Sequence, residues 1–101
     1  MTQKLTVEQH LLQKLSEECC EVSQAVSKAL LFGLHDTHET YGNNHDRIVI
    51  EVHDILGVLA ELVDRGIITM PVNPVPMIEA KREKILKYLS YADEKGMIAH
   101  D

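Results

Sequence analysis

Apolar residues in the first third of the chain recur with the period of an amphipathic helix. They are Leu11, Leu15, Val22 and Val26. Thr6 to Gln9 has the form of a capping box, in which the Thr hydroxyl and the Gln amide pair with backbone N–H groups at a helix start. Gly33 stands where a left-handed C-terminal cap is expected. The pattern predicts a long first helix from about Val7, closed by Gly33.

A second apolar stripe follows the polar segment Leu34–His45, LHDTHETYGNNH, which predicts a loop with at most a short helical turn. The stripe alternates steps of four and three residues and consists of Ile48, Val52, Ile55, Leu59 and Leu62. Asp46 or Asn44 is expected to cap this second helix, and Gly66 to end it.

The last third of the chain begins with a proline-rich connection. All three prolines fall between Ile67 and Pro76, so this stretch predicts irregular structure. A third helix is expected from Met77 to Ala92, followed by a fraying tail from Asp93 to Asp101. The inward residues of this helix are expected to be Ile78, Ile85 and Leu89. With no alternating strand pattern, the predicted fold class is all-α, a helical bundle completed by a partner chain.

Length and charge narrow the function classes. A chain of 101 residues supports one domain with a modest core. A net charge of -6 and no clustered run of Lys or Arg argue against nucleic acid and favour a cation as partner. No signal pattern or membrane-spanning apolar run is seen, so we expect a cytoplasmic protein without a membrane partner. Cys19 and Cys20 are expected to be reduced, with at least one packed as a small hydrophobe.

Three carboxylates fall within about one turn of the first predicted helix, in the stretch SEECCEV, Ser16–Val22. Glu18 lies three residues after Leu15 and four before Val22, so it falls on the buried stripe. An unpaired carboxylate is strongly disfavoured there. Either Lys14 pairs with these acids on a solvated face, or the acids share a ligand.

The second predicted helix carries two acids with related spacing. Glu51 and Asp54 stand three residues apart and project from the same side. A salt-bridged surface with Arg47 and Arg65 would also explain them. However, the neighbouring residues are apolar nearly all round, which predicts a central helix that cannot easily hide two carboxylates. If the two helices pack antiparallel, the acids converge into a set of oxygen ligands suited to Mg²⁺.

The order Glu17-Glu18-x-x-Glu21, a long gap and then Glu51-x-x-Asp54-Ile-Leu resembles the all-α nucleoside triphosphate pyrophosphohydrolase superfamily. This superfamily includes MazG-like proteins, dimeric dUTPases, dCTP pyrophosphatases and phosphoribosyl-ATP pyrophosphohydrolases. The resemblance covers the two long helices, from about Val7 to Gly66. It implies one MazG-like domain over residues 1–101. The apolar faces of the second helix exceed what one copy can cover, which predicts assembly into a homodimer or homotetramer.

The resemblance also implies an activity. It is that of a Mg²⁺-dependent hydrolase, in which Mn²⁺ can substitute, that converts an NTP or dNTP to the NMP and pyrophosphate for house-cleaning or nucleotide-pool control. By carry-over, the metal ligands would be Glu18, Glu21, Glu51 and Asp54. Glu17 or Glu21 would orient or deprotonate the attacking water. Candidates for binding the triphosphate are Lys28, Arg47, Lys81, Arg82 and Lys84.

Residues that could hold a nucleobase lie in or beside the polar loop. They are Phe32, His35, His38, Tyr41, Asn43 and Asn44. For most of them we expect a loop or capping role, with Phe32 in the core. A transition-metal site at His35 and His38 is disfavoured, because no further ligand has suitable spacing.

Other functions remain open from the sequence. A ferritin-like di-iron protein is disfavoured, because no His follows a Glu by three residues. A non-catalytic helical interaction module would leave the acids as surface charge, and a phosphoribosyl-ATP pyrophosphohydrolase-like enzyme is an alternative within the superfamily.

Overall fold

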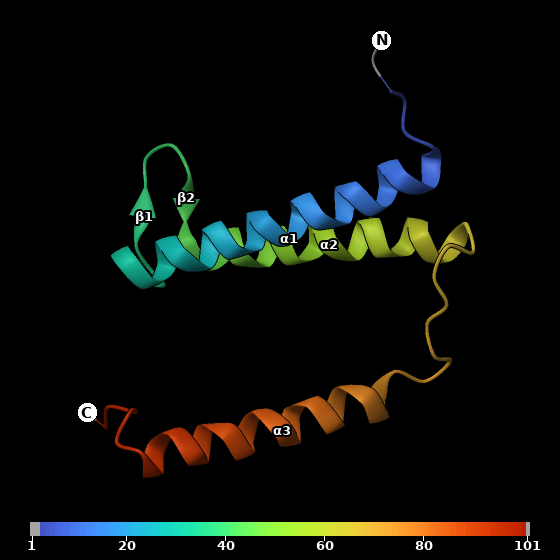
Figure 1. The fold of residues 1–101 in the computed structure, drawn as a ribbon. Helices are drawn as coiled ribbons and strands as arrows, with labels where there is room; N and C mark the ends of the chain where they lie inside the picture. Colours follow the sequence, from blue (N-terminus) through green and yellow to red (C-terminus); the bar gives the residue numbers. More distant parts are fainter. Residues whose placement is uncertain (1–2, 101) are drawn as a thin grey trace. The chain divides into compact units, whose positions relative to one another are not determined.

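The computed structural model describes residues 3–100, so Met1, Thr2 and Asp101 lie outside it. It contains three α-helices, α1 (Val7–Phe32), α2 (Asn44–Asp64) and α3 (Val75–Glu94), and two short strands, β1 (Thr37–His38) and β2 (Gly42–Asn43) (Figure 1). This content confirms the all-α class. The described residues form two compact units, with the boundary between Thr69 and Met70. The single domain expected over residues 1–101 stays a prediction.

The helix α1 begins and ends where its capping residues predict. The Thr6 hydroxyl accepts a hydrogen bond from the Gln9 backbone N–H at 3.1 Å, and the Thr6 backbone N–H donates to the Gln9 side chain at 3.0 Å. At the other end, the Gly33 N–H donates to the Ala29 carbonyl at 2.9 Å. Gly33 has φ 105° and ψ 140°. It therefore leaves the helix in a glycine-favoured conformation other than the left-handed helical one that was expected.

Gly33→Ala is expected to destabilise the protein by about 1–3 kcal/mol, because a residue with a Cβ rarely adopts this backbone conformation. An added Cβ would come only as near as 4.0 Å to the Asp36 Cβ, so the cost is conformational and not a clash. The matched control is Gly57→Ala within α2, where an added Cβ meets nothing within 4 Å. That change is expected to stabilise by about 0.5–1 kcal/mol, because Ala is the better helix former. Urea unfolding measures both, and shifts of the same sign would contradict this account.

The segment between α1 and α2 is a small hairpin instead of the predicted irregular loop. Thr37 pairs with Asn43, and His38 with Gly42, in an antiparallel ladder. Two-residue strands are too short to show an alternating pattern in sequence. The cap of α2 is also one residue earlier than expected, because the Asn43 side chain accepts from the Asp46 backbone N–H at 3.2 Å. The hairpin therefore leads directly into α2.

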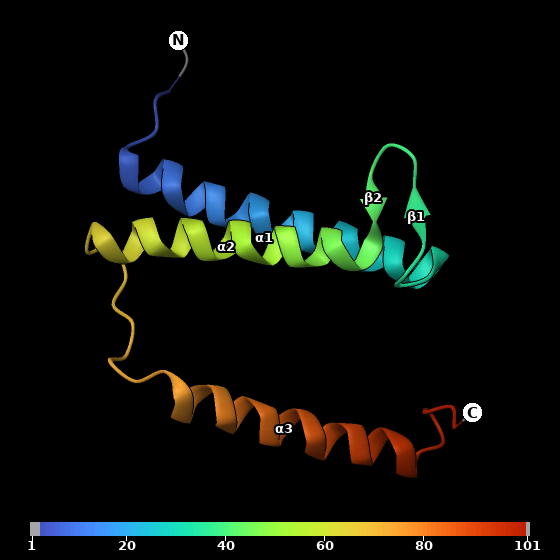
Figure 2. The same cartoon turned by 180° about the vertical axis from the view of Figure 1, so that it is seen from behind.

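The helices α1 and α2 pack side by side and run in opposite directions, as Figures 1 and 2 show. Buried and half-buried residues recur on each at alternating steps of four and three, the spacing of a coiled-coil seam. On α1 these seam residues are Leu11, Leu15, Glu18, Val22, Ala25 and Ala29. On α2 they are Asn44, Ile48, Glu51, Ile55, Val58 and Leu62. Glu18, Asn44 and Glu51 thus occupy positions where apolar residues are usual.

Three residues of the predicted stripes lie off this seam, namely Val26 and Val52, which are exposed, and Leu59, which is half-buried beside it. Val26 is 39% exposed and Val52 is 40% exposed, whereas Ala25 and Val58 are in the seam. Apolar residues stand on both sides of the true seam in the sequence. Which of them are buried depends on the position of the facing helix. Gly66, with φ 70°, follows the end of α2 as predicted.

The second unit contains a single helix, α3, which begins at Val75, two residues before the predicted start. Pro76 fits within its first turn, where no N–H partner is required. Asp93 and Glu94 are helical and not frayed. Its predicted inward residues Ile78, Ile85 and Leu89 are exposed, because a lone helix has no second element in its unit to pack on. Within residues 3–100, no helix combines the length and hydropathy needed to cross a bilayer.

Candidate metal centre and adjoining pocket

The α1–α2 seam brings carboxylates from both helices together. One oxygen each from Glu18, Glu51 and Asp54 lies within 4.8 Å of the other two. The Glu18 side chain is 14% exposed and that of Glu51 is 6% exposed, while Asp54 is exposed at the rim. Three of the four predicted metal ligands therefore converge, and the convergence comes from the antiparallel packing of the helices.

Nearby cations neutralise the cluster only in part. Lys14 lies 3.8 Å from Glu18, but it is also 3.5 Å from Glu17. Arg47 pairs with Glu51 at 3.0 Å. Among the described residues, Asp54 has no cation within ion-pair distance. The salt-bridged surface considered from the sequence thus exists for two of the three acids, and negative charge is left over.

Burial raises the pKa of the Glu51 carboxyl above its ordinary range. The Arg47 guanidinium opposes this effect and lowers the pKa, whereas the charges of Asp54, Glu21 and Glu18 raise it further. The net direction is upward. The metal-free site therefore holds a carboxylate that is disfavoured in its charged form, and a bound cation would relieve that cost.

Glu51→Gln is expected to stabilise the metal-free protein at neutral pH, with a gain over wild type that shrinks on acidification. Because the folded-state pKa of Glu51 lies above its ordinary value of 4.5, protonation favours folding, and that contribution is lost as the pH rises through the folded-state pKa. Gln stays neutral at every pH. Urea unfolding of both proteins in chelator, from about pH 8 to about pH 4, measures the difference. A gain that grew on acidification would contradict the raised pKa.

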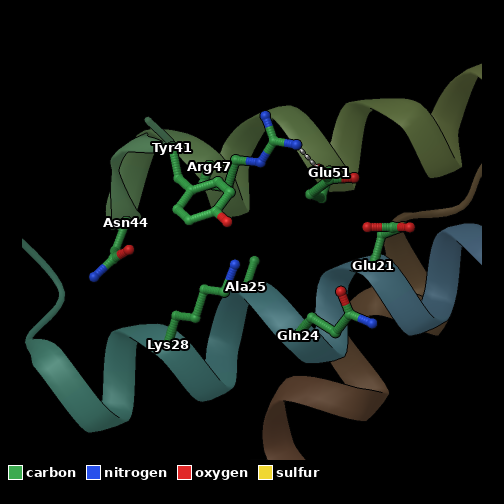
Figure 3. A pocket seen from close by; sticks show the side chains of 8 residues that line it. All are labelled: Glu21, Gln24, Ala25, Lys28, Tyr41, Asn44, Arg47 and Glu51. Carbon is green, nitrogen blue, oxygen red and sulfur yellow. Dashed lines mark ion pairs between the residues drawn. The ribbon is translucent and has the colours of Figure 1, made fainter. Parts of the chain in front are cut away.

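A cavity of about 180 Å³ adjoins the acidic cluster (Figure 3). Its lining residues come from α1, the hairpin and α2, and they are Glu21, Gln24, Ala25, Lys28, Tyr41, Asn44, Arg47 and Glu51. The Lys28 ammonium lies 4.0 Å from the centroid of the Tyr41 ring, a cation–π contact. Figure 3 shows Arg47 reaching toward Glu51 from α2 and Lys28 rising from α1. The cavity thus offers cations beside a cluster of acids, which suits a metal-bound polyanion.

The other predicted site residues lie in different parts of the structure. Glu21 lines the cavity but is not among the three clustered acids. Glu17 is exposed and pairs with Lys14, apart from both cluster and cavity. Lys81 and Lys84 are exposed on α3 in the second unit, and their binding role stays a prediction.

Two further expectations from the sequence are wrong. Phe32 is 67% exposed and not in the core, because it follows the last seam residue of α1. Cys19 and Cys20 are free, as expected, but both are exposed, since neither falls on a seam position. Gln24 also lines the cavity, although it was not among the residues predicted from the sequence. Its spacing of one helical turn from both Glu21 and Lys28 is the signal that could have found it.

Comparison of this chain with family models, curated proteins and solved structures finds no match.

Proposed function

We propose that this protein is a MazG-like, Mg²⁺-dependent nucleoside triphosphate pyrophosphohydrolase, which converts an NTP or dNTP to the NMP and pyrophosphate. One observation carries the proposal: Glu18 and Glu51 occupy seam positions, where their charge is costly, and they meet Asp54 beside a cavity lined by Lys28 and Arg47. Structural roles favour apolar residues at such positions, so their placement supports a ligand that compensates the acids.

The donor set fits Mg²⁺. This ion binds oxygen at about 2.1 Å, so two of its ligands lie at most about 4.2 Å apart. The observed limit of 4.8 Å is slightly longer, so the exposed Asp54 carboxylate would move closer on binding the ion. Mg²⁺ also keeps several waters, so three carboxylates at the end of an open cavity are a suitable set. Glu18, Glu51 and Asp54 would hold the ion, with Glu21 near enough to contribute electrostatically.

The ion would neutralise charge that develops on the phosphate oxygens. The chain's own residues then have distinct roles. Lys28 and Arg47 orient the triphosphate, because they are the cations of the cavity wall. Glu21 is better placed than Glu17 to take the proton from the attacking water, because it lines the cavity. Water attacks the α-phosphorus, the bond to the bridging oxygen breaks, and pyrophosphate leaves.

The test is a panel of nucleotides incubated with the protein and Mg²⁺ or Mn²⁺, with pyrophosphate and orthophosphate measured separately. We expect pyrophosphate release that stops in excess chelator. Orthophosphate as the only product, or activity that survived chelation, would contradict the proposal.

A non-catalytic interaction module is the second candidate, favoured by the ion pairs that Lys14 and Arg47 already make with the seam acids. Melting temperatures measured with and without Mg²⁺ distinguish the hydrolase from the interaction module. A specific ligand of the folded state raises the melting temperature by mass action, whereas an interaction module should show little change.

We also propose a homo-oligomer, at least a dimer, built on helix packing. Large apolar side chains remain exposed along the outer side of α2, at Val49, Ile50, Val52, Leu56 and Val63. Large apolar side chains left exposed on one helix favour an interface with another copy. Light scattering is expected to give a multiple of the 11.4 kDa chain, and a monomer at working concentrations would contradict the assembly.

A further inference from the structure

A second cavity, of about 230 Å³, is formed by the end of α1, the hairpin and the start of α2. It is lined by Lys28, Phe32, Asp36, His38, Tyr41 and Asn44. Lys28, Tyr41 and Asn44 also line the first cavity, so the two spaces adjoin. A ligand with its phosphates beside Lys28 and Arg47 would therefore place its other end among these aromatic and polar side chains.

Asn44 carries an unused acceptor into this space. The side chain is at a seam position and only 7% of the residue is exposed. Its amide nitrogen donates to the Gly33 carbonyl at 2.9 Å. This hydrogen bond assigns the positions of the amide nitrogen and oxygen. Within residues 3–100 no donor reaches the amide oxygen, and Figure 3 shows that oxygen on the side of Tyr41. Among the described residues no side-chain polar atom is both buried and without a partner, so this oxygen is accessible from the cavity and can accept a hydrogen bond from a ligand.

The hairpin adds donors and acceptors of defined kind. The Thr40 backbone N–H donates to Nδ1 of His38 at 3.0 Å, so the neutral ring carries its proton on Nε2 and can donate there. Asp36 lines the cavity and makes no ion pair with any described residue, so its carboxylate is available as an acceptor. Lys28 supplies a further donor above the Tyr41 ring. The cavity thus combines two acceptors, Asp36 and Asn44, with two donors and exposed aromatic faces.

We propose that this second cavity binds the nucleobase of the substrate and selects guanine, an inference that rests on the proposed function. Guanine alone among the common bases presents two adjacent N–H groups, N1–H and N2–H₂, beside an oxygen acceptor. The Asp36 carboxylate accepts from that pair, and His38 donates to O6. The aromatic rings of Phe32 and Tyr41 provide stacking surfaces. The unpaired Asn44 oxygen accepts from a remaining donor of the nucleoside.

The first experiment compares kcat/KM for GTP, ITP, ATP and CTP. ITP differs from GTP only in lacking the N2 amino group. We expect GTP to exceed ITP by about 10- to 100-fold, the effect of one hydrogen bond to a charged group. Asp36→Ala should remove this preference and bring the ratio near one. Asp36→Asn is the second variant in case Ala disturbs folding, and it should also weaken the preference because the amide has a single acceptor oxygen. Glu39→Gln, at an exposed hairpin acid outside the cavity, is the matched control and should keep the wild-type ratio.

The second experiment measures binding without hydrolysis. It therefore tests the guanine site independently of the proposed pyrophosphohydrolase function. GMP and IMP are titrated in chelator, and amide chemical shifts of the hairpin report binding. Tighter binding of GMP, lost in Asp36→Ala, supports the guanine site even if no nucleotide is hydrolysed, in which case only the proposed function fails. Pyrophosphate release with equal kcat/KM for GTP and ITP, or a preference for another base that Asp36→Ala leaves unchanged, overturns the guanine site and leaves the function standing.

Discussion

Asp54→Asn is expected to lower Mg²⁺-dependent hydrolysis by about 100-fold or more, because losing a ligand removes several kcal/mol of charge stabilisation. The same change should leave the metal-free protein as stable as wild type or slightly more so. Asp54 makes no ion pair with any described residue, and its charge raises the pKa of Glu51 by repulsion. Neutralising Asp54 therefore relieves repulsion while it removes a ligand.

Melting temperatures of wild type and Asp54→Asn, each with and without Mg²⁺, measure both effects. The Mg²⁺-dependent rise should be greatly reduced in the variant, because the ion stabilises only through its affinity for the folded state. Glu61→Gln is the matched control on the same helix, since Glu61 accepts from Arg65 at 3.1 Å and lies outside the cluster. It should cost about 0.2–1 kcal/mol and keep the full Mg²⁺ effect. A lowered melting temperature for metal-free Asp54→Asn, with an unchanged Mg²⁺ shift, would end the metal-site proposal.

Leu62→Ala is expected to destabilise the protein by about 2–5 kcal/mol, the range for removing a large buried aliphatic side chain. Leu62 is 0% exposed and is the only large side chain among the described residues that is fully buried. Since the core of one copy is so small, this loss is a large fraction of the total stability of a typical domain, about 5–15 kcal/mol.

Urea unfolding measures the Leu62 effect against Val72→Ala, at a fully exposed side chain in the connection before α3. That control should change stability by less than about 0.5 kcal/mol. Equal losses for the two variants would mean that the seam between α1 and α2 is not the core of the folded protein.

The sequence by itself determined the local features of this protein. The capping box at Thr6 and the glycines at 33 and 66 predicted where α1 starts and where both long helices end, because caps depend on neighbouring residues only. The spacing of Glu18 from Leu15 and Val22 placed a carboxylate on the buried stripe, because side chains three and four residues apart share a helix face.

The hairpin and the identity of some seam residues were beyond sequence reasoning. Strands of two residues carry no periodic signal, and apolar residues such as Val26 and Val52 stood beside the true seam as equal alternatives. The choice is made by the facing helix, because only one set of side chains can be covered by it.

Only the tertiary structure decided which acids meet. Glu17, Glu18 and Glu21 are close in sequence, yet Glu18 alone joins Glu51 and Asp54, while Glu21 lines the cavity and Glu17 pairs with Lys14. The register between the antiparallel helices sets these distances, and it results from packing along the whole seam. The free oxygen of Asn44 has the same origin, since its amide is oriented by the Gly33 carbonyl eleven residues earlier in the chain. Distances between distant segments cannot be inferred from the spacing within either helix, which is why the sequence could name candidate acids but could not select the three that converge.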